Sequence, residues 1–495
     1  MRDGQVLADY EAVKPLRRPE PPAGDEVAPA EVSAPAADGL GGARVKAKQA
    51  KAAKPAKLRA DNWVAKRGHL VTYVGLFLFT AFVYFRPYEL FNAPFLGSGA
   101  EFLAVLTLLA YLPSQLSAEG NLTARPREVN LALLLLIAAL LSVPTAISPG
   151  EAWDNFVNFS KVILIFVVAV NVTRTEWRLR GLLTLAMAAS LLLSFSAFND
   201  YRLGRLDFGG ERVKGMLGGM FDNPNDLALH LVTMVPLAVG LAFARRGPLT
   251  KVAYLLCAAL FTAGVVVSFS RGGFLGLAVS ACVLGWKLGR KRRFLVGALM
   301  LASLLIFVAA APGDYGARLS SMFGGDVTGS ADARRELLWR SVMVALRYPL
   351  TGVGLGCFYY KGARDQVSHN AYTQVAAEMG MAALVVYVLF MVTSIRRLRR
   401  VERETLEAKD RASFYYLSVG MQASIIGYMV CSFFASVAHL WYVYYLVAYS
   451  VALRRIYALK YGEPGQEEEE KKKNAGAPSP AGDEAPAATA ASLTL

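Results

Sequence analysis

The residues best suited to chemistry lie in one polar, glycine-punctuated stretch, 334–380, of a chain that is otherwise mostly apolar. His369 begins an apolar run there, and a histidine at a membrane–water boundary can act as a general base near neutral pH. The alternative for His369 is a structural, hydrogen-bonding role, which a lone histidine more commonly has. Asn370 follows it as a candidate for substrate binding. Glu378, a further candidate for substrate binding, lies inside the same run, where a carboxylate should be paired or face a cavity.

Arginines supply the second kind of chemistry. Arg271 lies between two apolar runs, where a guanidinium costs about 3 kcal/mol on insertion scales and normally faces a cavity or a partner. Snorkelling to the interface is the alternative. Because a planar guanidinium holds phosphate through two hydrogen bonds, Arg271 favours a lipid phosphate or pyrophosphate.

A helix is expected over 331–347, because apolar residues recur there with helical spacing. Arg335 and Trp339 stand four apart and would share one face of it. Trp339 can instead anchor the helix at the membrane interface. Trp339 and Arg334, which precedes Arg335, are further candidates for substrate binding.

A second polar island contains Asn223, Asn225 and Asp226 around a proline. Asn225 or Asp226 could cap the apolar helix that follows. With Asp222, the island has two asparagines, two aspartates and a proline, which exceed what a single cap requires, so it could also bind sugar hydroxyls.

Composition places all these residues in a membrane protein. The 495 residues are 55% hydrophobic and their mean hydropathy is +0.36, higher than a soluble chain of this size usually has. The net charge of +15 could indicate nucleic acid, but Lys and Arg collect in short loops between apolar runs, as orientation signals do. We therefore expect membrane lipids, and no nucleic acid, as partners. The four cysteines form no close pair and the four histidines have no His-x-x-x-His spacing, so neither a disulfide framework nor a metal site is predicted.

The expected fold is an all-α polytopic membrane protein with about twelve transmembrane helices and one long outer-face loop that contains helices. Each apolar run is compatible with the roughly 20 residues that a bilayer requires. The expected spans are 69–86, 100–116, 129–147, 159–173, 180–198, 226–244, 251–270, 272–289, 293–312, 370–395, 412–434 and 436–455. This transmembrane domain would cover 69–461, with the long periplasmic loop at 313–369, between disordered tails at 1–68 and 462–495.

Basic residues predict the orientation. Every loop on the side of the Lys-rich N-terminal tail carries Lys or Arg, so this side should be cytoplasmic and should hold both termini. The 334–380 stretch and Arg271 then lie on the outer face, away from cytoplasmic ATP. The alternating Gly352, Gly354 and Gly356 follow no strand, so they suit a tight re-entrant loop better than a nucleotide fingerprint.

Taken together and in this order, these motifs resemble those of the bacterial O-antigen ligase and polymerase superfamily of polytopic membrane proteins. The resemblance covers residues 221–383, and Ala383 stands where the ligase pattern expects Gly or Thr, so ligase and polymerase both stay open. The matching motifs are Asn223-Pro224-Asn225-Asp226, Ser270-Arg271-Gly272-Gly273, Arg335 with Trp339, Pro349 to Phe358, and His369-Asn370 with Gly380.

The resemblance implies a membrane glycosyltransferase in the bacterial inner membrane whose active site faces the periplasm. The donor would be a glycan on undecaprenyl pyrophosphate. The acceptor would be lipid A-core for a ligase of lipopolysaccharide, or a second lipid-linked repeat unit for a polymerase of O-antigen or exopolysaccharide. Arg271 and Arg335 would hold the pyrophosphate leaving group, and His369 would orient or deprotonate the acceptor hydroxyl. No metal, nucleotide or other cofactor would be required.

A membrane transporter of a small solute is the alternative from another class, since many spans with intramembrane polar residues fit one. The long outer loop and the lack of repetition between the two halves count against it.

Overall fold

Helices make up all the regular structure of the residues that the structure describes. The computed structural model describes residues 63–91, 93, 96–206, 213, 221, 223–245, 247–289, 329–362 and 366–461. In these ranges there are α-helices and short 3₁₀ helices and no strand, which confirms the expected all-α class. Residues 63–68 of the expected N-terminal tail belong to the first helix. The rest of that tail, the C-terminal tail and the expected span 293–312 lie outside the described residues.

The described α-helices differ widely in length. In chain order they are α2 (Trp63–Phe85), α3 (Pro87–Leu90), α4 (Gly99–Glu119), α5 (Arg127–Ser142), α6 (Pro149–Val172), α7 (Glu176–Arg202), α8 (Pro224–Ala244), α9 (Pro248–Val267), α10 (Arg271–Leu288), α13 (Gly329–Arg347), α14 (Ala371–Met379), α15 (Met381–Thr405), α16 (Ala412–Cys431) and α17 (Trp441–Tyr461). The 3₁₀ helices are η4 (Cys357–Tyr360), η6 (Lys409–Arg411) and η7 (Ser432–Phe434).

Seven helical segments of this described part are long and apolar enough to cross a membrane, fewer than the expected twelve. They are Gly99–Ser117, Pro149–Val172, Glu176–Arg202, Pro224–Ala244, Pro248–Val267, Met381–Thr405 and Lys409–Phe434. Length explains part of the difference, because α5 has only 16 residues. The expected span 370–395 is not one helix: the chain breaks at Gly380, with a φ of 92°, between the nine-residue α14 and the longer α15.

Helices α8 and α16 pack closely against each other in the core. A Cβ added to Gly240 would lie 2.9 Å from the Tyr416 carbonyl oxygen, and one added to Gly420 would lie 2.7 Å from the Pro236 carbonyl oxygen. Small residues at such contacts let helix backbones approach, as is usual between membrane helices. On the same pair, α10 packs against both α8 and α16. This packing fixes the position of Arg271, the first residue of α10.

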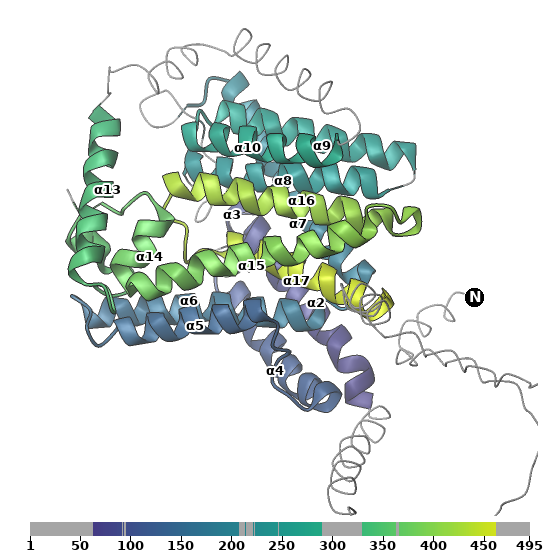
Figure 1. The fold of residues 1–495 in the computed structure, drawn as a ribbon, viewed down its shortest axis with the longest axis horizontal. Coiled ribbons are helices and arrows are strands. Elements are labelled where there is room, and N and C mark those ends of the chain that lie inside the picture. Colours follow the sequence, from purple (N-terminus) through teal and green to yellow (C-terminus); the bar gives the residue numbers. More distant parts are fainter. Residues whose placement is uncertain are drawn as a thin grey trace, which may run out of the picture.

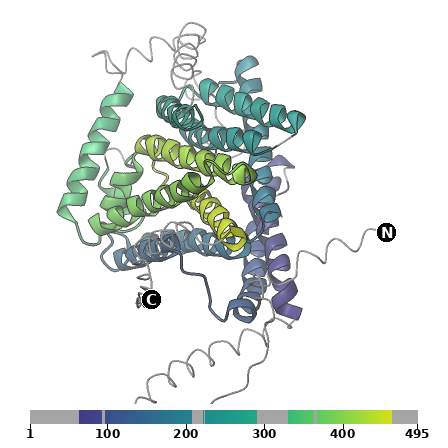
Figure 2. The ribbon, with the colours of Figure 1, turned by 45° about the vertical axis from the view of Figure 1, so that its right-hand side comes forward.

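Helices α13 and α14 lie at one end of the bundle (Figure 1). Helix α13 stands across the ends of the longer helices, and α14 lies between it and the start of α15; the turned view keeps both light green helices at this end (Figure 2). Leu337, Ser341 and Ala345, spaced four apart, form the buried side of α13. The helix expected at 331–347 is therefore present, packed on α14.

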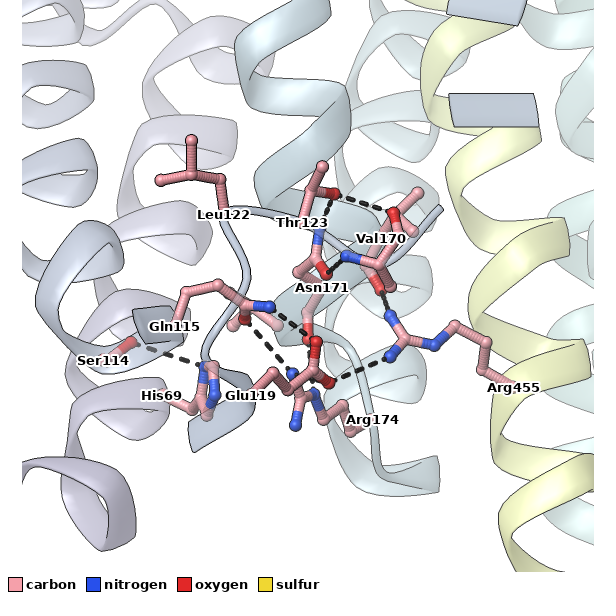
Figure 3. Close-up of polar contacts among 12 residues, drawn as sticks. His69, Ser114, Gln115, Glu119, Leu122, Thr123, Val170, Asn171, Arg174 and Arg455 are labelled. Carbon is pink, nitrogen blue, oxygen red and sulfur yellow. Dashed lines mark hydrogen bonds and ion pairs between the residues drawn. The ribbon is translucent and has the colours of Figure 1, made fainter. Parts of the chain in front are cut away.

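The opposite end of the bundle is held together by ion pairs between helices (Figure 3). Glu119 of α4 lies 2.7 Å from Arg174, after α6, and 3.5 Å from Arg455 of α17. Asn171 joins the group because Arg174 Nε donates to its carbonyl at 2.7 Å, and its own amide donates to Val167 and Thr123 oxygens. Both arginines belong to the basic loops that are expected on the cytoplasmic side of the membrane. In the structure they also pair with an acidic residue of another helix.

Candidate functional site

Three segments that are far apart in the sequence bring Arg271, Arg334 and His369 together. Burial lowers the pKa of Arg334, and the charge of Arg271 lowers it further. Burial likewise lowers the pKa of His369, and Arg334 adds to the effect. Each of these shifts requires the charges to be near one another. The start of α10, the side of α13 and the approach to α14 therefore meet in one cationic cluster, which we define as Arg271, Arg334 and His369.

His369 is held in a strained backbone conformation just before α14. Its φ is 50°, in the left-handed region that costs a non-glycine residue about 1–2 kcal/mol. The next residue, Asn370, caps α14: its Oδ1 accepts from the backbone N–H of Tyr372 at 2.9 Å and of Thr373 at 3.1 Å. The Ser368 hydroxyl donates to the Asn370 carbonyl at 2.9 Å. The histidine thus lies in a turn fixed on both sides, and Asn370 has a structural task that the sequence did not single out.

Arg271 follows a similar turn at the start of α10. Phe269 has a φ of 51°, and the Ser270 side chain caps the helix by accepting from Gly273 N–H at 3.2 Å. Gly272 is buried where an added Cβ would lie 2.8 Å from the Phe434 Cβ. The two glycines after Arg271 therefore serve close packing of α10, and neither has a positive φ.

The Asn-Pro-Asn-Asp island is joined to this turn. Asn223 caps α8 by accepting from Asn225 N–H at 2.8 Å, and the Ser270 hydroxyl donates to Asn225 Oδ1 at 2.9 Å. Asp226 lies in the first turn of α8, where the helix dipole favours a negative charge. Both asparagines therefore have structural contacts, and the island borders the cationic cluster through Ser270.

The two arginines at the start of the polar stretch differ in their surroundings. Arg334 is partly buried, whereas Arg335 and Trp339 lie on the exposed side of α13. Trp339 is 66% exposed. Arg335 and Trp339 do share one side, as their spacing predicts, but this is the side turned away from α14. The structure groups Arg334, rather than Arg335, with Arg271 and His369.

The glycine loop, residues 349–358, closes the other end of α14. Gly352, Gly354 and Gly356 have φ values of 69°, 103° and 77°. Val353 N–H donates to the Ala377 carbonyl at 2.8 Å, and Gly354 N–H donates to the Glu378 carbonyl at 3.1 Å. The loop thereby satisfies carbonyls that a helix C-terminus leaves unpaired. Its glycines are explained by this tight fit against α14.

Glu378 is buried at the C-terminal end of α14, outside the candidate spans. Burial raises the pKa of its carboxyl to about 8, although the amides of Gly356 and Phe358 and the Gln374 side chain act in the opposite direction. Its Oε2 lies 3.7 Å from His439 Nδ1. Its contacts lie inside the protein, and its partner His439 was not singled out in the sequence because no motif surrounds it.

A cavity of about 480 Å³ lies between α2, α4, α6 and the start of α17. Its walls are mainly apolar and aromatic, with Arg86, Glu101 and Lys161 as charged residues. Lys161 Nζ lies 2.8 Å from Glu101 Oε1. Trp441 lines this cavity and follows His439 closely in the chain.

Among the described residues, no group of three or more His, Cys, Asp or Glu side chains is arranged to hold a metal ion. The cationic cluster of Arg271, Arg334 and His369 can perform acid–base and electrostatic chemistry. It offers an imidazole that is neutral near pH 7 and two guanidinium groups that can bind an anion.

Comparison with known families agrees with the motifs. Residues 256–388 match the family model described as O-antigen ligase, which confirms the resemblance to that superfamily. The matched region contains Arg271, Arg334 and His369, together with α14 and the glycine loop. Comparison with the curated proteins gave no match.

Proposed function

Because residues 256–388 match the O-antigen ligase family model and several described helices are long and apolar enough to cross a membrane, we propose that the protein transfers a glycan from undecaprenyl pyrophosphate to an acceptor hydroxyl. The cationic cluster carries the proposal. Two guanidiniums beside one neutral imidazole suit a reaction that releases a pyrophosphate and consumes a hydroxyl proton.

In the proposed reaction, the acceptor oxygen attacks the anomeric carbon of the donor glycan. A new carbon–oxygen bond forms while the bond to the pyrophosphate oxygen breaks. His369 accepts the hydroxyl proton, and Arg271 with Arg334 stabilises the charge that develops on the leaving pyrophosphate. Arg335, on the exposed side of α13, would contact the glycan or pyrophosphate from the aqueous side. Asn370 positions the turn that holds His369.

The proposed setting is the bacterial inner membrane, with both termini cytoplasmic and the cluster facing the periplasm. Support comes from the two ends of the bundle. Arg174 and Arg455, two arginines of the expected inside loops, lie at the end shown in Figure 3, and basic residues normally stay on the cytoplasmic side. Asn225 and Asp226 border the cluster through Ser270 and could contact sugar hydroxyls there, with Trp339 at the outer edge.

Deletion of the gene followed by analysis of surface glycan tests the function and separates its two forms. Core lipid without polymer, while polymer is still made, indicates a ligase. Single repeat units on the core indicate a polymerase of O-antigen. His369→Ala at normal protein level should reproduce the deletion, and unchanged glycan would contradict the proposal. No feature of the described residues favours the transporter alternative; uptake of a solute into vesicles that survives Arg335→Ala would revive it.

A further inference from the structure

Three buried polar side chains follow one another from the cap of α14 along the helix. Gln374 and Glu378 are four apart on α14, which places them one helical turn apart on the same side, and Asn370 caps the start of the helix. They are only 2%, 9% and 2% exposed. Asn370 Nδ2, Gln374 Oε1 and Glu378 Oε2 each have no hydrogen-bond partner. Buried polar atoms of this kind are rare in folded proteins, so a row of three requires an explanation.

His439 faces this row from the connection between η7 and α17. Its Nδ1 lies 3.5 Å from Gln374 Nε2 and 3.7 Å from Glu378 Oε2, and its Nε2 has no hydrogen-bond partner. The ring of Phe159 on α6 packs edge-on against the imidazole, with 5.3 Å between centroids. The imidazole is therefore enclosed between α6 and the polar side of α14.

These groups are uncharged near neutral pH. The pKa of Glu378 is raised to about 8 by burial, and burial lowers the pKa of His439 to about 4. The other titratable groups near the carboxyl are Cys357 on η4 and, through it, Glu151 on α6. Among the described residues, no arginine or lysine acts on the pKa of Glu378. An ionised Glu378 would thus be a buried charge without a cation.

We propose that Glu378, Gln374 and His439 are positioning residues for the transfer reaction, an uncharged group that holds α14, and with it His369, in place for catalysis. This inference rests on the proposed function. A helix of nine residues is about 13 Å long and moves as a unit. The glycine loop, α14 and the 435–440 connection all meet at Glu378, so a shift there displaces the turn that carries His369.

Ionisation of Glu378 would disturb this arrangement, since a buried carboxylate must be paired or rehydrated. His439 cannot supply a positive charge at high pH, because burial keeps its pKa low. The group should therefore fail above about pH 8, and transfer should fail with it.

The test measures initial rates of glycan transfer by the full-length protein in lipid nanodiscs between pH 6 and pH 9.5, with a lipid-linked donor and acceptor. For the unsubstituted protein, the rate should fall about tenfold from pH 7 to pH 9, as one group with a pKa near 8 loses its proton. Glu378→Gln keeps an uncharged side chain of the same shape, so it should stay within about threefold of the unsubstituted rate at pH 7 and lose the alkaline fall. His439→Leu should lower kcat and leave KM unchanged.

Glu336→Gln is the matched control, because Glu336 is exposed and pairs with Arg340 on α13; its pH profile should not move. A folded Glu378→Gln protein that is inactive at pH 7 would overturn the proposal, since the carboxyl itself would then be needed. An alkaline fall that persists unchanged in Glu378→Gln would overturn it as well.

Thermal melting provides a readout that needs no substrate, so failure of the proposed function can be told apart from failure of this inference. The carboxyl ionises near its ordinary value of 4.5 in the unfolded chain and near 8 in the folded one. Its protonated form therefore stabilises the fold fully below pH 4.5, and this advantage disappears as pH rises to 8. The Tm of the unsubstituted protein relative to Glu378→Gln should fall across this window and stay level above it. If the difference in Tm between the unsubstituted protein and Glu378→Gln does not change with pH, the proposal that Glu378 is uncharged is overturned, whether or not transfer is observed.

Discussion

Arg334 lies close enough to His369 for its charge to lower the pKa of the imidazole beyond the lowering that burial causes. The imidazole is therefore neutral near pH 7, which is the form that accepts a proton. Arg334 also has Arg271 as a like-charged neighbour. An anion bound between the two guanidiniums would offset their repulsion. The cluster should therefore favour binding of a pyrophosphate.

Replacing Arg334 should change how transfer depends on pH. In Arg334→Gln the positive charge beside His369 is gone, so the pKa of the imidazole should rise toward its ordinary value. A base must be unprotonated to act, and the acid limb of the kcat/KM profile should therefore move to higher pH. Rates of the purified protein between pH 5 and pH 8 measure the shift. Arg335→Gln is the matched control: its side chain is exposed, so it can weaken substrate binding but should leave the midpoint of the acid limb in place. Equal shifts in both variants would contradict the assignment of Arg334.

Gly352→Ala should destabilise the protein by about 2–4 kcal/mol, because alanine is strained at positive φ and its Cβ must displace backbone. The φ of Gly352 is 69°, and the added Cβ would lie 2.3 Å from the carbonyl carbon of Glu378. Thermal melting in detergent or nanodiscs measures the effect. Gly150→Ala is the control, since an added Cβ there meets nothing within 4 Å in the first turn of α6. It should be neutral or slightly stabilising, as alanine favours a helix over glycine.

Ser270→Ala should cost about 1–2 kcal/mol, because it removes the cap of α10 and leaves Asn225 without this donor. Since Arg271 directly follows Ser270, kcat should fall together with the Tm. Thr250→Ala serves as the comparison: the Thr250 hydroxyl donates to the Gly247 carbonyl at an exposed position away from the cluster. Its Tm and kcat should both stay close to those of the unsubstituted protein; an identical loss in both variants would argue against a special role for the Ser270–Asn225 bond.

Glu128→Gln should lower stability by about 3–5 kcal/mol, since it removes the buried carboxylate that pairs with two arginines of other helices. Glu128 is fully buried on α5, 2.7 Å from Arg454 and 3.5 Å from Arg397. Glu101→Gln breaks an exposed pair with Lys161 and should cost no more than about 1 kcal/mol. Denaturation midpoints of the two variants compare them directly, and similar midpoints would contradict the expected difference between buried and exposed pairs.

Much of the helical architecture could be predicted from apolar periodicity alone. The all-α class and the helix at 331–347 followed from it and are present. The number of membrane spans was predicted less accurately, because the length of an apolar run does not reveal where a helix breaks. Gly380 interrupts an apolar run that looks continuous, and the reason is a close contact: a Cβ at this position would lie 2.3 Å from the Leu350 carbonyl oxygen. Only the folded chain brings Leu350 there.

The site residues show the same division. The sequence nominates His369 and Arg271 through their polar setting in an apolar chain, and these positions do approach each other through Arg334. The choice between Arg334 and Arg335 depends on which side of α13 faces α14, and adjacent residues on a helix differ by about 100° in direction. His439 carried no signal in the sequence, because its role depends on contacts with α14 that only tertiary packing creates.

The helix caps described above have an electrical consequence. Helices α8, α10 and α14 begin after Asn223, Ser270 and Asn370. The Ser270–Asn225 bond joins the first two beginnings, and η7 is packed against both α10 and α14. A helix beginning carries about half a positive charge from its aligned peptide dipoles, so the backbone itself contributes a positive potential at the cluster. Substituting one arginine would therefore remove only part of the attraction for an anionic leaving group, and the remainder would be independent of any side chain.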